Sequence, residues 1–292
     1  MEAKTIAIFG GDKRFLFCGG SLAQAGCNVL MFGFDQFKTT EHPLKEKLTL
    51  TNDCDLLTKA DCVILPPQPI DADGCVAAPL NSKPLHLNQK IAEIIKNKKI
   101  FAGFEYVLKE HVPQLAQSDI TDYPALEEFA VLNAVPSAEG AIGVAIENFE
   151  GTLHGAKCLV CGYGRIGKVL AADLSSLHAK VTVSARKPTD LALITAFGHT
   201  AIETSAIANG CDYDIIFNTI PRLIFDERTL KKTNPAALII DLASKPGGVD
   251  FKAARKLNID TIHALSLPGK TAPRAAGEII ATTILNCLNT QI

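Results

Sequence analysis

The residues KCLVCGYGRIGKVL, at positions 157–170, decide the fold of the second half of this 292-residue chain. The apolar run at 158–161 predicts a buried strand, and apolar residues resume at helical spacing after the glycines. Gly162 predicts a tight turn, Gly164 a close approach of the backbone to a pyrophosphate, and Gly167 close packing of a helix on the strand. Amides at the helix start would hold the phosphates. The pattern predicts a dinucleotide-binding turn, which also contains Tyr163, Arg165 and Ile166.

Strands and helices alternate outward from this turn. In the second half we predict strands at 157–161, 180–184, 214–218, 237–241 and 260–264, with helices at 165–177, 190–197 and 251–257. In the first half we predict strands at 5–9, 28–32, 61–65 and 100–102, with helices from about 13 to 25 and at 88–96. Such alternation is typical of a parallel sheet wrapped by helices. The sequence therefore predicts an α/β protein with two Rossmann-like, doubly wound domains.

The domain junction is predicted in a helical segment, 125–149, which Pro136 should kink or break. Residues 1–128 would form the substrate domain and residues 129–271 the dinucleotide-binding domain. The last helix, predicted at 272–288, begins with a proline in its first turn and has no place in the second sheet. We expect 272–292 to cross back onto the first domain and leave a cleft between the domains.

Composition narrows the class of protein. A formal net charge of −2 provides no field that would attract nucleic acid or an anionic membrane, and we identify no apolar run long enough to span a bilayer. The chain begins directly with a strand, so we predict no signal peptide. The nine cysteines lie in apolar segments and are interpreted as reduced core residues. We expect a cytoplasmic protein.

The end of the second strand predicts the choice of nucleotide. In NAD-binding domains an acidic residue there bonds the ribose 2′-hydroxyl. This strand ends VSARK at 183–187, without a carboxylate. Ser184 can donate to a 2′-phosphate, and Arg186 and Lys187 can neutralise it, so NADP is favoured over NAD.

Two further strand ends supply candidate cofactor contacts. Residues FNTIP, 217–221, end the strand predicted at 214–218, and DLASKPGG, 241–248, ends the strand predicted at 237–241, close to where a nicotinamide would lie. Either segment can also be ordinary turn chemistry. The candidate residues are Asn218, Thr219, Ile220, Pro221, Ala243 and Ser244.

These elements together resemble a known family. The matching segments are IAIFGGDKR at 6–14, NAVPSAEGAI at 133–142, GYGRIG at 162–167, FNTIP, DLASKPGGVDF at 241–251 and LPGKTAPRAAGEII at 267–280. The chain resembles the family of dipicolinate synthase A-subunits over nearly its whole length. GYGRIG is shared with several dehydrogenase families, whereas the GGDKR opening and the last segment are specific. FLFC, at Phe15–Cys18, departs from the more polar helix start expected there.

The resemblance implies NADP-dependent oxidation of dihydrodipicolinate, drawn from the lysine and diaminopimelate branch, to dipicolinate. It implies the mother-cell cytoplasm of a sporulating bacterium and a partner, the dipicolinate synthase B-subunit, which is similar to flavin-binding proteins. We also expect a homo-oligomer, and neither nucleic acid nor a membrane as a partner.

A substrate with two carboxylates needs cations and anion-binding amides. Lys270, Thr271 and Arg274 are predicted at the start of the last helix, with Lys270 and Arg274 on one face, and Arg14 could reach in from the other domain. Ser137 and Glu139 at the kinked junction should face the same crevice. Lys270, Glu139 and Ser137 are the candidate catalytic residues. The histidines show no metal spacing, so no metal is predicted, and none stands out as a base.

Two alternatives stay open. A stand-alone amino-acid or hydroxy-acid dehydrogenase would need a histidine or lysine base held by a carboxylate near the nicotinamide. A scaffold would bind NADP and leave the chemistry to its flavoprotein partner.

Overall fold

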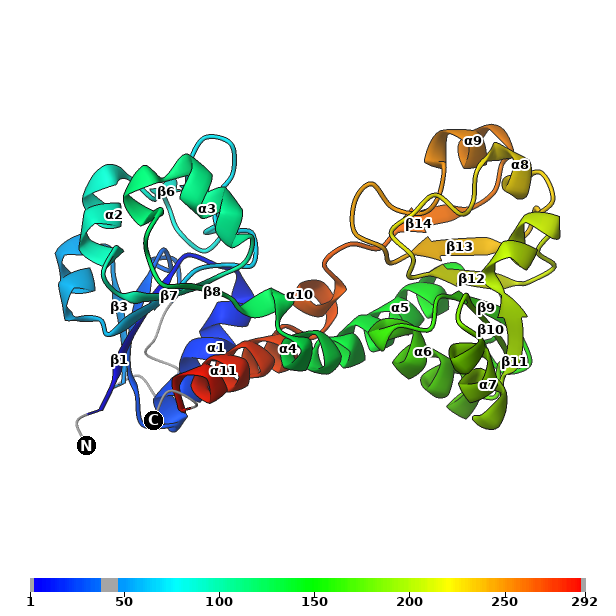
Figure 1. Ribbon diagram of the computed structural model, residues 1–292, viewed down its shortest axis with the longest axis horizontal. Helices are drawn as coiled ribbons and strands as arrows, with labels where there is room; N and C mark the ends of the chain where they lie inside the picture. Colours follow the sequence, from blue (N-terminus) through cyan, green and yellow to red (C-terminus); the bar gives the residue numbers. More distant parts are fainter. Residues whose placement is uncertain (1–2, 38–46, 290–292) are drawn as a thin grey trace. The chain divides into compact units, whose positions relative to one another are not determined.

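The computed structural model describes residues 3–37 and 47–289. Contacts divide the chain into unit 1, Met1–Leu132 with Ala272–Ile292, and unit 2, Asn133–Thr271 (Figure 1). The division falls at Leu132, where 128 was predicted, and the functions assigned to the two parts stay predictions.

Unit 1 is built on a parallel six-stranded sheet with the order β3-β2-β1-β4-β7-β8. Its strands are β1 (Thr5–Phe9), β2 (Asn28–Phe32), β3 (Leu48–Thr51), β4 (Cys62–Ile64), β7 (Lys99–Ala102) and β8 (Ile120–Asp122). A separate antiparallel ribbon pairs β5 (Cys75–Val76) with β6 (Leu85–His86). The helices are α1 (Lys13–Gln24), α2 (Gln89–Ile95), α3 (Glu105–His111), α4 (Glu127–Leu132) and α11 (Pro273–Asn289), with 3₁₀ turns at Cys54–Lys59, Pro113–Leu115 and Tyr123–Ala125.

Unit 2 repeats this plan with the strand order β11-β10-β9-β12-β13-β14. Its strands are β9 (Lys157–Cys161), β10 (Lys180–Ala185), β11 (Thr200–Glu203), β12 (Ile215–Asn218), β13 (Leu238–Asp241) and β14 (Thr261–His263). Its helices are α5 (Ala134–Asn148), α6 (Arg165–Ser176), α7 (Pro188–Ala196), α8 (Glu227–Leu230), α9 (Phe251–Lys256) and α10 (Leu267–Thr271), with a 3₁₀ turn at Thr204–Asn209. The prediction of two doubly wound α/β units is confirmed.

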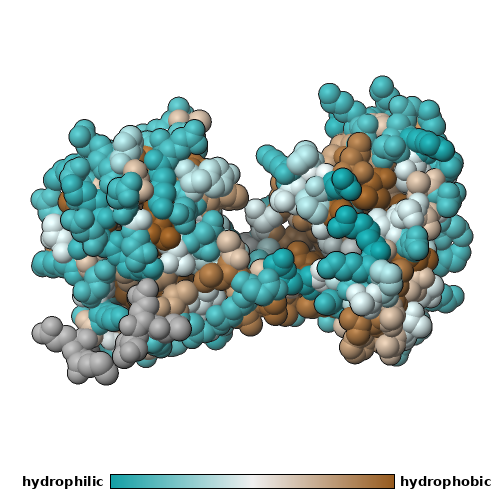
Figure 2. Space-filling view, viewed as in Figure 1, coloured by the Kyte–Doolittle hydropathy of each residue, from teal (hydrophilic) through white to brown (hydrophobic). Residues whose placement is uncertain are grey.

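Helices cover both faces of each sheet, and the core lies in the layers between. In unit 2, α5, α6 and α7 lie on one face and α8 and α9 on the other (Figure 1). Cys158 and Cys161 enter these two opposite core layers, and all nine cysteines are free. In Figure 2 the visible face of unit 1 is mostly hydrophilic, whereas hydrophobic residues gather around α7, where Leu193 and Phe197 are exposed.

The last helix packs on α1 within unit 1, which confirms the predicted return of the chain. A Cβ on Gly277 would lie 2.1 Å from the carbonyl oxygen of Arg14, so the two backbones touch closely. Ile280 and Ile284 share one core with Phe15 and Cys18. Because α11 covers α1 on one side and the sheet covers it on another, Phe15 and Cys18 of the apolar FLFC segment are buried, whereas Phe17 is exposed.

The helix predicted over 125–149 is divided at Asn133, between α4 and α5. Pro136 lies in the first turn of α5, where the absence of its N–H costs little stability. Its ring would clash with the carbonyl group of Leu132 in a continuous helix, so the helix is interrupted before α5. The stretch Glu127–Asn148 also has the length and hydropathy of a membrane span, but half of it is buried within the protein. We expected no apolar run long enough to span a bilayer, and this stretch corrects that expectation. Buried core helices of soluble proteins also meet the same criterion of length and hydropathy.

Candidate functional site

The three glycines after β9 occupy different surroundings. Gly162 has a φ of +98°, and a Cβ there would lie 2.6 Å from Thr219 Oγ1. A Cβ on Gly167 would lie 2.1 Å from the carbonyl oxygen of Gly162, so helix and turn are in close contact. Gly164 precedes α6, and a Cβ there would meet nothing within 4 Å. The turn is therefore tight, closely packed and open at Gly164, which is the arrangement that a dinucleotide pyrophosphate requires.

The other residues of the turn contribute unequally. Arg165 is the exposed first residue of α6, and Ile166 is half-buried. The side chain of Tyr163 lies under Lys168, whose Nζ is 5.3 Å from the ring centroid. Tyr163 also lines a hollow of about 530 Å³ together with Phe197 and His199. Burial and the nearby Asp190 carboxylate raise the pKa of Tyr163.

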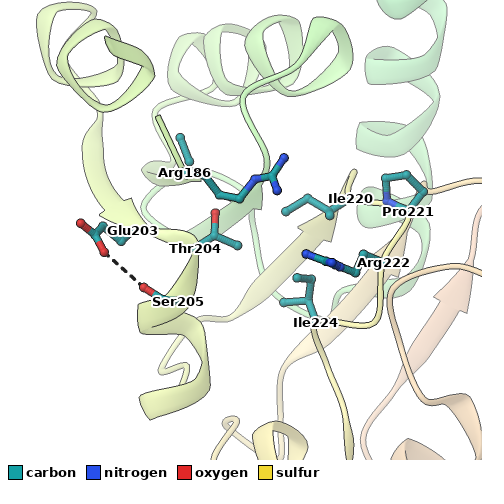
Figure 3. A pocket seen from close by; sticks show the side chains of 9 residues that line it. Arg186, Glu203, Thr204, Ser205, Ile220, Pro221, Arg222 and Ile224 are labelled. Atoms are coloured by element: carbon teal, nitrogen blue, oxygen red, sulfur yellow. Dashed lines mark hydrogen bonds between the residues drawn. The ribbon is translucent and has the colours of Figure 1, made fainter. Parts of the chain in front are cut away.

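A hollow of about 610 Å³ lies at the carboxyl ends of β10, β11 and β12. Ile220, which also contacts Gly162, connects this hollow to the glycine turn. Figure 3 shows the guanidinium groups of Arg186 and Arg222 and the hydroxyl of Thr204 around one space. The lining residues are Ala185, Arg186, Glu203, Thr204, Ser205, Ile220, Pro221, Arg222 and Ile224.

Three polar side chains of this hollow, those of Arg186, Arg222 and Thr204, have no protein partner among the described residues. Among the residues that the structure describes, neither Arg186 nor Arg222 has a side-chain hydrogen bond or ion pair. Thr204 Oγ1 is buried without a hydrogen-bond partner. Glu203 points away, and Ser205 Oγ donates to its Oε2 at 3.2 Å (Figure 3). Buried polar atoms normally have partners, so the arrangement fits an anionic ligand that accepts hydrogen bonds.

Two of these residues were missed in the sequence analysis. Arg222 directly follows the FNTIP segment, and its position after a strand end was the available signal. Thr204 follows β11, a strand that was not predicted.

Ser184 requires a correction. The strand β10 continues through Ala185, so Ser184 lies inside the sheet and is fully buried. Its Oγ is 3.4 Å from the amide nitrogen of Gly162, and its carbonyl oxygen accepts from the same amide at 3.0 Å. Ser184 supports the glycine turn and cannot contact a 2′-phosphate. Lys187 is exposed at the start of α7, outside the residues that line the hollow.

Asn218 also requires a correction, because it is fully buried beside Asp241. Asn218 Nδ2 donates to Asp241 Oδ1 at 2.8 Å and to the carbonyl oxygen of Ile220 at 3.0 Å. Asp241 Oδ2 accepts from the amide of Gly248 at 2.7 Å. This network fixes the loops after β12 and β13, and the carboxylate within it was not predicted.

The remaining strand-end candidates differ in access. Thr219 Oγ1 donates to the carbonyl oxygen of Cys161 at 2.8 Å, which connects β12 to β9. Pro221 lines the hollow. Ala243 is buried and its carbonyl oxygen lies 3.0 Å from His263 Nε2, whereas Ser244 is exposed.

The predicted shared helix face of Lys270 and Arg274 is wrong. Lys270 and Thr271 end α10 in unit 2, whereas Arg274 belongs to α11 in unit 1, because Pro273 cannot continue the preceding helix. Arg274 is 77% exposed and its Nε donates to Glu278 Oε1 at 2.8 Å. Thr271 Oγ1 donates to the carbonyl oxygen of Leu267 at 2.9 Å, and Lys270 is exposed.

Some of the candidate substrate-binding and catalytic residues at the start of α1 and α5 already have hydrogen-bond partners within the protein. In unit 1, Arg14 binds Asp12 with two nitrogens, Nε and Nη2, each 2.9 Å from a carboxylate oxygen. In unit 2, Ser137 is buried and its Oγ donates to the carbonyl oxygen of Asn133 at 2.7 Å. Glu139 is exposed. The pKa of the Asp173 carboxyl is raised, mainly by the burial of Asp173 and also by the negative charge of Glu139. The Ser137 hydroxyl therefore bonds to the backbone of its own helix and is not directed toward a substrate as a proton acceptor.

Comparison with known proteins agrees with the fold. The model of the N-terminal domain of dipicolinate synthase A-subunits matches residues 5–118. The A-subunit of Bacillus subtilis dipicolinate synthase is 32% identical over 97% of this chain and 95% of that protein. The crystal structure of its Bacillus halodurans counterpart superposes with a TM-score of 0.89 at 30% identity, covering 98% of this chain and 97% of that one. A Sinorhizobium meliloti transhydrogenase, 14% identical with a TM-score of 0.71 and coverage of 99% and 94%, shares the fold.

The curated relative is similar over almost the whole of both chains, well beyond the matched N-terminal domain. This chain belongs to the family of dipicolinate synthase A-subunits.

Proposed function

We propose that this chain is the NADP-binding oxidoreductase component of a cytoplasmic dipicolinate synthase and that it oxidises dihydrodipicolinate during sporulation. Support comes from the family and from the dehydrogenase-type fold of both units. Because the curated relative is named as one lettered component of a synthase, we also propose a partner, the B-subunit.

The observation that carries the proposal is the pair of unpartnered guanidinium groups in the hollow beside the glycine turn. A 2′-phosphate can form charge-assisted, two-pronged hydrogen bonds with Arg186 and Arg222 and can accept from Thr204. A ribose 2′-hydroxyl carries no negative charge and could not form an ion pair with either guanidinium group. The residues present therefore fit NADP better than NAD.

Each part of unit 2 would have a defined task. The open backbone at Gly164 and the amides of α6 would hold the pyrophosphate. The loop at 243–248, held by the Asn218–Asp241 network, would border the nicotinamide. When bound, NADP supplies a hydride acceptor for a ring that loses one hydride and one proton as it becomes aromatic. Arg14 and Lys270 are proposed to neutralise the substrate carboxylates.

Whether this chain is the catalyst or only a scaffold depends on which group removes the proton from the substrate ring. The hydroxyls of Ser137 and Thr271 donate to backbone carbonyls, so neither is oriented as a base. Glu139 and Lys270 are exposed and remain the candidates within this chain. This observation keeps a second function open, in which the chain binds NADP and substrate while the B-subunit removes the proton.

A reconstitution assay separates these functions. Dihydrodipicolinate would be generated in place, and formation of both reduced NADP and dipicolinate would be followed with this chain, with the B-subunit, and with both. We expect NADP-dependent dipicolinate formation whenever this chain is present, with NADP reduced in equal amount. Dipicolinate formation at the full rate in the absence of this chain would refute the proposal. Activity only in the mixture, without NADP reduction, would support the scaffold.

A further inference from the structure

An aromatic side chain in unusual backbone geometry lies at the carboxyl end of β7. Phe104, between β7 and α3, has φ +48° and ψ 53°, which is the left-handed region that bulky side chains rarely adopt. Its side chain is not folded into the core, since the residue is 44% exposed. A strained residue persists only where the surrounding structure fixes it, and such residues cluster at ligand sites.

The neighbours of Phe104 hold it firmly. A Cβ on Gly103 would lie 2.0 Å from the carbonyl oxygen of Pro67, so this backbone is in direct contact with the loop after β4. The amide of Val107 donates to the carbonyl oxygen of Phe104 at 2.8 Å. The Tyr106 ring meets the Phe104 ring edge to face, with centroids 6.1 Å apart. Phe104 is therefore presented as a rigid apolar surface.

The same edge of the sheet carries a cationic side chain. In open parallel sheets, ligands bind outside the carboxyl ends of the strands. Arg14 follows β1 there, and its guanidinium is bound to the Asp12 carboxylate at 2.9 Å. Tyr123, which is fully buried, follows β8, and its hydroxyl donates to the carbonyl oxygen of Leu65 at 3.4 Å. Strand β4 alone lies between β1 and β7 in the sheet, so Arg14 and Phe104 follow strands that are two places apart at the same edge. Next to Phe104, the negative charge of Glu105 is neutralised by Lys109 at 2.7 Å.

We propose that Phe104, braced by Tyr106, is the stacking surface for the flat six-membered ring of the substrate, with Arg14 as a cation on the same sheet edge. This inference rests on the proposed function for the identity of the ring. Flat rings gain from stacking on an aromatic face beyond the area that they bury. Exposed Phe104 supplies such a face without rearrangement of the core.

The sequence contains no tryptophan, which permits a direct binding measurement. In a Phe104→Trp variant of the full chain with NADP present, titration with dipicolinate should quench the fluorescence of the single tryptophan, excited selectively, in a saturable way. The matched control is Phe197→Trp on unit 2, where Phe197 is 69% exposed, and it should show no saturable change. Equal responses of the two variants would overturn the inference.

Two further variants separate ring binding from folding. In the reconstituted synthase, Phe104→Ala should raise the KM for dihydrodipicolinate by about tenfold and leave NADP affinity unchanged. Phe104→Gly relieves the positive φ, so its Tm should be no lower than that of the parent, yet its KM should rise equally. An unchanged KM in both variants, with the parent enzyme active, would refute the stacking role alone. A parent enzyme without NADP-dependent oxidation would refute the proposed function instead.

Discussion

At the scale of single residues, the glycines after β9 have different roles, one in folding and another in the proposed ligand binding. Gly167 faces the backbone oxygen of Gly162, which cannot move without opening the turn. Gly164 faces open space, so the fold itself places no steric demand on it. A side chain at Gly164 would only occupy volume that we assign to the pyrophosphate.

Gly164→Ala should therefore leave the free energy of unfolding within about 0.5 kcal/mol of the parent and weaken NADP binding by about tenfold or more. Gly167→Ala should cost about 1–3 kcal/mol of stability, because its Cβ overlaps a backbone oxygen. Urea unfolding and NADP titration of both variants measure these effects. Unchanged NADP affinity in Gly164→Ala would place the nucleotide elsewhere.

The glycine turn has the predicted backbone geometry, whereas the predicted directions of several candidate side chains are wrong. The glycine spacing defines a turn whose geometry suits a pyrophosphate, whereas Ser184 and Asn218 point into the protein. Successive residues of a strand face opposite sides, so the direction of a terminal side chain depends on the residue at which the strand ends. That residue is set by pairing with neighbouring strands, which the sequence does not display.

At the scale of elements, the contact between α1 and α11 depends on one small residue. Gly277→Ala should destabilise unit 1 by about 1–3 kcal/mol, because a Cβ would lie 2.1 Å from the Arg14 carbonyl oxygen and 2.9 Å from the Cys18 nitrogen. The control is Gly143→Ala in α5, where a Cβ meets nothing within 4 Å and alanine should gain about 0.5–1 kcal/mol from helix propensity. Urea unfolding compares the two. A Gly277→Ala variant as stable as the parent would contradict the packing of α11.

The elements that were predicted are those with the strongest patterns. Interior strands such as β1 and β9 are continuous apolar runs buried on both faces. Within the two six-stranded sheets, the strands β3, β8 and β11 were missed, and all three lie at sheet edges with the mixed sequences LTLT, ITD and TAIE. An edge strand has a neighbour on one side only, so its sequence carries a weaker signal. The helix α10 was not predicted, and its residues Lys270 and Thr271 were assigned to the start of the last helix, because a proline is tolerated at a helix start as well as after a helix end.

At the scale of the whole molecule, the two units share one strand order but not one ligand-binding turn. In unit 1 a Cβ on Gly10 would lie 2.4 Å from Val76, and one on Gly11 would lie 2.2 Å from the ring of Phe15. The corresponding turn of unit 2 is open at Gly164. This difference supports our proposal that unit 2 binds the nucleotide and that the aromatic and cationic groups of unit 1 bind the substrate.

The central claim is that unit 2 binds NADP through Arg186 and Arg222, and calorimetric titration of the full chain with NADP and NAD tests it most directly. We predict that NADP binds at least about tenfold more tightly than NAD. Arg186→Ala and Arg222→Ala should each cost about 1.5–3 kcal/mol toward NADP and little toward NAD, and Lys187→Ala, outside the hollow, should change neither. Equal affinities of the unmodified chain for the two nucleotides, or arginine variants that bind NADP as the parent does, would contradict the account.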